Sequence, residues 1–94
     1  MHMIKSFGDK KTQLFHEGNY VKNFQAFARQ AEKRLRILEA ADSLESLMRL
    51  PSNHCKALSG SRIGQFSIRI NDQWRLCFEW HQDGAYNVQI IDYH

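Results

Sequence analysis

Basic side chains are concentrated in residues 56–77, which hold Lys56, Arg62, Arg69 and Arg75 but a single acid, Asp72. The rest of the chain has as many acidic as basic residues, so the formal net charge of +3 at pH 7 comes from this segment. Arginine and lysine bind phosphate through charge-assisted hydrogen bonds. The segment therefore predicts an anion site, with Lys56, Arg62 and Arg69 as phosphate-binding candidates.

Histidines near this segment and at the end of the chain could supply proton transfers. RNA cleavage without a metal needs a base for the 2′-hydroxyl, cations for the charge on the phosphate and an acid for the leaving oxygen. Histidine titrates near neutral pH, and His54 and His94 are the candidates, while Tyr93 could stack on a nucleotide base. From the residues alone, a frayed terminus with no role is the favoured explanation of His94, and His54 and Lys56 could equally be solvated loop residues.

Alternating apolar residues predict three strands that would position these side chains, over residues 66–70, 74–80 and 86–92. One face of each strand is apolar and should pack on the core. The core-facing sets are Phe66, Ile68 and Ile70; Trp74, Leu76, Phe78 and Trp80; and Tyr86, Val88 and Ile90. Asp83 and Gly84 are typical of the turn that joins the last two strands.

The apolar faces also predict the register of the first two strands. Opposed residues of antiparallel strands share a face, and the shortest loop consistent with this is residues 71–73, which pairs Ile70 with Trp74. Arg69 then lies opposite Arg75, on the side of the sheet away from the helices. Opposed like charges cost about 0.2–1 kcal/mol, a cost that an anion between them would offset. The same alternation places Tyr93 near both arginines.

Helices should cover the apolar face of the sheet. A short strand over residues 4–7 precedes a helix over 10–16, and a main helix carries apolar residues at spacings of three and four over residues 24–41. A third helix, over residues 44–50, ends at Pro51, and a loop over 51–65 leads into the sheet. The sequence predicts a small α+β domain with helices on one face of an antiparallel sheet of about four strands.

Length and composition favour a single ordinary domain spanning residues 1–94, of which residues 1–2 are interpreted as a cloning remnant. Apolar residues make up 43% and charged residues 24%, as in soluble globular domains. The chain shows no signal peptide or membrane span, so a cytoplasmic location is expected. Cys55 and Cys77 are then free thiols, and ligand spacing typical of a metal site is missing, so no cofactor is expected.

The chain strongly resembles the HigB-type toxins of bacterial type II toxin–antitoxin modules, a branch of the RelE-like superfamily. The resemblance is most specific in two runs, LSGSRIGQFSIRINDQWRLCFEW over residues 58–80 and IIDYH over 90–94, and it extends from MIKSF at residues 3–7 to the last histidine. It implies a RelE-like fold and a metal-independent mRNA endonuclease that acts in the ribosomal A site. It also implies neutralisation by a HigA-type helix-turn-helix antitoxin, through which the pair binds its operator DNA.

Carried over by position, the resemblance implies that Arg69 and Arg75 hold phosphate. Asp92, Tyr93 and His94 would form the C-terminal part of the active site, with Tyr93 stacking on or orienting the nucleotide.

The chain departs from the family pattern at Lys56, where some members have a catalytic histidine; the nearest histidine, His54, lies two positions earlier. Lys56, His54 and His94 are thus all candidates for the general base. The alternative to a nuclease is a non-catalytic toxin on the same fold that binds a protein target such as gyrase or the ribosome. The Asp92–His94 end together with the two arginines favours the nuclease.

Overall fold

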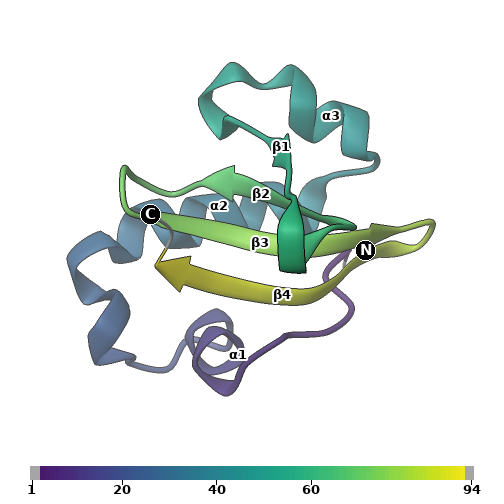
Figure 1. Cartoon of the computed structure of the whole chain (residues 1–94). Helices are drawn as coiled ribbons and strands as arrows, with labels where there is room; N and C mark the ends of the chain where they lie inside the picture. The colour runs from purple at the N-terminus through teal and green to yellow at the C-terminus, as the bar shows by residue number, and fades with distance from the viewer. Residues whose placement is uncertain (1–2, 93–94) are drawn as a thin grey trace.

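The computed structural model describes residues 3–92, and a helical layer and a sheet make up its architecture (Figure 1). The sheet is antiparallel with the order β1-β2-β3-β4. Its strands are β1 (Lys56–Ala57), β2 (Gln65–Arg69), β3 (Trp74–His81) and β4 (Gly84–Asp92). The α-helices are α1 (Lys10–His16), α2 (Ala28–Ala40) and α3 (Leu44–Arg49). The predicted α+β class is confirmed.

Side-chain caps start the two short helices α1 and α3. The Asp9 carboxylate accepts a hydrogen bond from the Thr12 amide at 2.8 Å, and the Ser43 hydroxyl accepts one from the Ser46 amide at 3.1 Å. Each bond satisfies an amide that has no partner within the first turn of the helix.

The predicted main helix is divided in two, a 3₁₀ segment over Lys22–Phe27 followed by α2. In a 3₁₀ turn, residues three apart eclipse one another, so Phe24 and Phe27 lie on the same side. Both rings contact Trp74, with centroid distances of 5.9 and 4.8 Å. The tighter turn thus places two aromatic rings against the first residue of β3.

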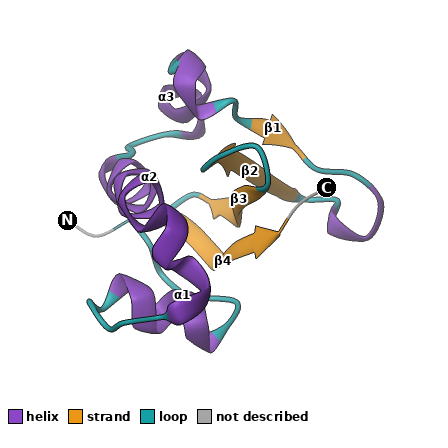
Figure 2. Cartoon of the chain, turned by 90° about the vertical axis from the view of Figure 1, so that its left-hand side faces the viewer, coloured by secondary structure: helices purple, strands orange, loops and turns teal. Residues whose placement is uncertain are grey.

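The core lies between α2 and one face of the sheet (Figure 2). Leu35 and Leu38 of α2 are buried, as are the sheet residues Ile68, Leu76 and Val88. Burying one such side chain contributes about 1.5–3 kcal/mol. The helical layer therefore covers the apolar face of the sheet, and the opposite face carries the arginines. Within residues 3–92, no helix is long and apolar enough to cross a membrane.

Two edges of the sheet differ from the prediction. The segment expected as a strand over residues 4–7 forms only isolated parallel bridges to β4, between Ile4 and Ala85 and between Phe7 and Val88. The segment 51–65, expected as a loop, contains the short strand β1, which pairs with β2. The edge next to the arginines is therefore closed by β1.

The prediction that Tyr86 faces the core is wrong. Tyr86 pairs with Glu79, whereas Gln89 pairs with Cys77, so β4 has one extra residue relative to β3. Asn87 takes up this residue in the left-handed region, with φ 54°, a conformation that asparagine tolerates better than most residues. The extra residue reverses the alternation, and Ala85 rather than Tyr86 is buried.

Candidate functional site

The turn between β2 and β3 brings two arginines face to face. The Ile70 amide donates to the Trp74 carbonyl at 3.0 Å, and Arg69 is the direct cross-strand partner of Arg75. Asn71 fixes the turn, because its side-chain oxygen accepts from the amides of Gln73 and Trp74, both at 2.8 Å. The predicted register is confirmed.

Arg75 is held in a buried position, with 8% of its surface exposed. Its Nε donates to the Ser67 hydroxyl at 2.7 Å, and its Nη2 donates to the His54 carbonyl at 2.5 Å. Ser67 lies on the adjacent strand and is itself fully buried. These bonds fix the plane of the guanidinium against the sheet.

Arg69 is held differently, by an ion pair between its Nη2 and the Asp72 carboxylate in the turn. The Arg69 side chain is 38% exposed and that of Asp72 is 96% exposed. An exposed ion pair contributes about 0–1 kcal/mol, so Asp72 can be replaced by another anion at little cost. Each arginine thus has its own acceptors, which relieves the repulsion expected from the register.

A polar hollow of about 480 Å³ opens where these arginines meet the segment before β2. His54, Cys55 and Lys56 line one side, and the other side is lined by Arg69, Asp72 and Arg75. Lys56 is placed there by β1, in which it pairs with Ser67. Three cationic side chains against one carboxylate give the hollow a positive charge, suited to a phosphate group.

Two thiols lie beside this charge. Burial raises the pKa of Cys55, and the positive charge of Arg75 opposes that rise. Burial likewise raises the pKa of Cys77, opposed by Arg62 and Arg75. Both cysteines are free and should be protonated at neutral pH, so neither is an activated nucleophile. Among residues 3–92, His, Cys, Asp and Glu side chains form no group of three that could hold a metal.

The remaining predicted site residues lie elsewhere or outside the described residues. Arg62 donates to Gln65 at 3.1 Å and to Gln89 at 3.4 Å, so it lies over the sheet and does not line the hollow. Asp92, at the end of β4, accepts from Gln73 at 3.0 Å and is not part of the lining. The predictions for Tyr93 and His94 fall outside residues 3–92.

Three residues that support the site were missed from the sequence: Ser67, Asn53 and Arg34. Asn53 is fully buried and accepts from Arg34 of α2 at 2.8 Å. The alternation of β2 places Ser67 on the same face as Arg69 and could have indicated it. Asn53 and Arg34 are joined only by tertiary packing, which no local pattern reveals.

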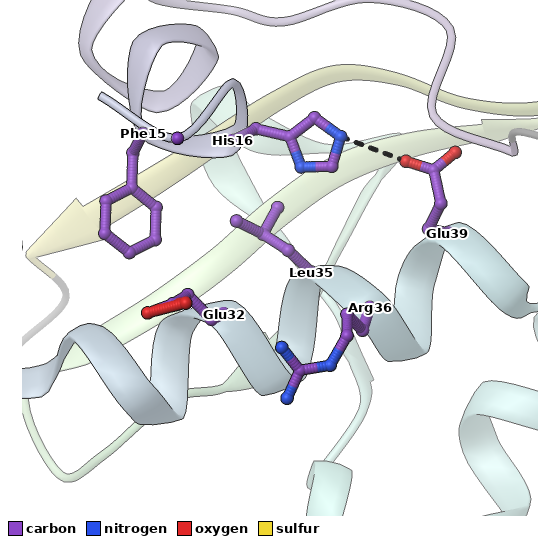
Figure 3. A pocket seen from close by; sticks show the side chains of 7 residues that line it. Phe15, His16, Glu32, Leu35, Arg36 and Glu39 are labelled. Carbon is purple, nitrogen blue, oxygen red and sulfur yellow. Dashed lines mark ion pairs between the residues drawn. The ribbon is translucent and has the colours of Figure 1, made fainter. Parts of the chain in front are cut away.

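A second hollow, of about 210 Å³, lies between α1 and α2 on the helical side of the sheet (Figure 3). Phe15 and Leu35 line it together with charged residues, and His16 forms an ion pair with Glu39 at 3.1 Å. Glu32 and Arg36 of α2 also line it (Figure 3). Its apolar surface and mixed charges do not suit a phosphate, so the basic hollow is the candidate site.

Solved structures of bacterial toxins share the fold of this chain. The model resembles a solved YoeB–YefM complex from Staphylococcus aureus with a TM-score of 0.57 at 18% identity, covering 97% of each chain. It also resembles a YoeB/ParE toxin from Agrobacterium tumefaciens with a TM-score of 0.51 at 14% identity, covering 97% of this chain and 96% of that one. Similarity at this level of identity establishes the fold.

Sequence comparison establishes the family. Residues 5–94 match the family model of HigB-like toxins, described as the RelE-like toxin of type II toxin–antitoxin system HigB. The chain is 33% identical to toxin HigB-1 of Vibrio cholerae over 92 residues, covering 94% of this chain and 95% of the relative. It is 30% identical to endoribonuclease HigB of Proteus vulgaris, covering 98% and 100%. The chain therefore belongs to the HigB-like family of type II toxins, which act opposite an antitoxin partner.

Proposed function

We propose that this toxin is a ribosome-dependent endoribonuclease that cleaves mRNA in the A site. The observation that carries the proposal is the opposed pair Arg69 and Arg75, which meets Lys56 around an open, positively charged hollow. A relative that is 30% identical over 98% of this chain bears the name endoribonuclease. A phosphate of RNA is the anion that such a hollow would bind in an enzyme of this kind.

Arg75 would stabilise the charge that develops on the phosphate during 2′-hydroxyl attack. Its bonds to Ser67 and His54 set the orientation of the guanidinium before RNA binds, so little reorganisation is needed in the transition state. Arg69 would exchange the Asp72 carboxylate for the phosphate, since that ion pair is exposed. Binding and charge stabilisation are thus divided between the two arginines.

Residues around Arg69 and Arg75 would transfer the protons. Lys56 lines the hollow, and we propose that His94 and Asp92 contribute from the end of the chain, with Tyr93 stacking on the nucleotide. Cleavage then requires no metal, because cationic side chains meet the phosphate charge and side chains transfer the protons. The toxin would act in the cytoplasm. A HigA-type antitoxin would inhibit it, and the pair would bind the operator DNA through the antitoxin.

Mapping of mRNA 5′ ends tests this function. Purified toxin is added to ribosomes paused on a defined mRNA, and the same RNA without ribosomes serves as the control. We expect new 5′ ends at the A-site codon only in the presence of ribosomes. Translation arrest without new ends would reject the nuclease and favour a protein-binding toxin, whereas equal cleavage of naked RNA would reject the ribosome dependence.

A further inference from the structure

His54 adopts a left-handed backbone conformation, with φ 44° and ψ 49°. This conformation is uncommon for residues other than glycine, and it is enriched at functional sites. The turn that contains it is short: Pro51–Asn53 forms a 3₁₀ helix, and the His54 amide donates to the Pro51 carbonyl at 3.1 Å. The left-handed residue ends this helix and redirects the chain into β1, next to β2 (Figure 1).

The buried side chain of Asn53 holds this turn in place. Its Nδ2 donates to the Leu47 carbonyl of α3 at 2.9 Å, and its Oδ1 accepts from Arg34 of α2 at 2.8 Å. The Asn53 amide donates to the Leu50 carbonyl at 3.0 Å. Two helices therefore fix the residue that directly precedes His54, which keeps the left-handed conformation in a single arrangement.

The turn directs the His54 carbonyl at the guanidinium of Arg75. Arg75 Nη2 donates to this oxygen at 2.5 Å, while Nε donates to Ser67. Acceptors on two different segments thus contact two different nitrogens of one planar group, which fixes its plane as well as its position. The same turn leads into Lys56, which lines the hollow with Arg75.

We propose that His54 serves the site through its main chain and that Asn53 is a positioning residue for Arg75. The left-handed turn holds Arg75 in the orientation that the phosphate requires. The inference rests on the proposed nuclease activity.

A matched pair of substitutions separates the two roles of His54. His54→Gly and His54→Val both remove the imidazole, but glycine favours the left-handed backbone and valine, being β-branched, strongly disfavours it. We expect His54→Val to cleave mRNA on ribosomes at least about tenfold more slowly than His54→Gly in single-turnover assays, because both variants lack the imidazole and differ in how readily they adopt the left-handed backbone. Equal losses in both variants would assign the role to the imidazole, and equal retention would show that the turn is dispensable; either result overturns the proposal.

A spectroscopic measurement tests the positioning without any cleavage. The Nε–H resonance of Arg75 reports its bond to Ser67, and it should keep its chemical shift in His54→Gly and move in His54→Val. If His54→Val does not fold, His54→Ala replaces it and should move the signal in the same direction by less, because its side chain disfavours the left-handed region less strongly. A signal that is the same in all variants overturns the positioning role. If wild-type toxin cleaves no RNA while the signal behaves as expected, the nuclease proposal fails and the positioning of Arg75 stands.

Discussion

Replacing Arg75 by alanine should destabilise the fold much more than replacing Arg69. Arg75→Ala removes buried bonds to the Ser67 hydroxyl and the His54 carbonyl, and a hydrogen bond to a charged group contributes about 1.5–3 kcal/mol. Loss of the repulsion with Arg69 returns about 0.2–1 kcal/mol. We therefore expect the free energy of unfolding to fall by about 2–6 kcal/mol.

Arg69→Ala is the matched control, because it removes the same charge from the directly opposed position. Its ion pair with Asp72 is exposed, so a change within about 1 kcal/mol is expected. For a domain of this size, 1 kcal/mol corresponds to a shift in Tm of roughly 4–8 °C. Urea denaturation and thermal melts followed by circular dichroism measure both. An Arg75→Ala variant as stable as wild type, or a larger loss in Arg69→Ala, would refute the anchoring of Arg75.

Three further predictions concern the core, the turn and the thiols. Leu38→Ala, at a fully buried position of α2, should cost about 2–5 kcal/mol in denaturant melts; a cost below 1 kcal/mol would contradict the packing. Asn71→Ala removes the acceptor of two turn amides and should cost about 1 kcal/mol, whereas an unchanged Tm would show that the turn needs no side chain. The pKa of Cys55 is raised by burial, so its alkylation, followed by mass spectrometry, should reach half-maximal rate at a higher pH than that of free cysteine; a lower midpoint would contradict the burial.

The arginine pair could be predicted from sequence because it depends on local alternation. Apolar residues on β2 and β3 select one register, and that register places Arg69 opposite Arg75. The same reasoning failed for Tyr86, because the left-handed residue Asn87 adds one position to β4 and reverses its alternation. A single inserted residue leaves no signature in the apolar pattern, so the error begins where the strand becomes irregular.

The enclosure of the site could not be predicted, because it depends on contacts between distant segments. The strand β1 has only two residues, Lys56 and Ala57, too few for a detectable alternation. Its place is set by pairing with β2 and by the buried Asn53, which contacts both α2 and α3. Basic composition indicated an anion site, whereas the orientation of Arg75 emerges only from the folded arrangement.

We propose above all that the residues lining the basic hollow cleave RNA. A single-turnover cleavage assay on ribosomes paused on a defined mRNA tests this most directly. Arg75→Ala is compared with Arg36→Ala, which removes the same charge from α2 beside the hollow on the helical side. Both variants are assayed at a temperature at which circular dichroism shows them folded. Arg75→Ala loses one preorganised donor to the transition state, so its cleavage rate should fall about 10²–10³-fold. The cleavage rate of Arg36→Ala should stay close to that of the wild type. Equal rates for the two variants, whether both fast or both slow, would contradict the claim.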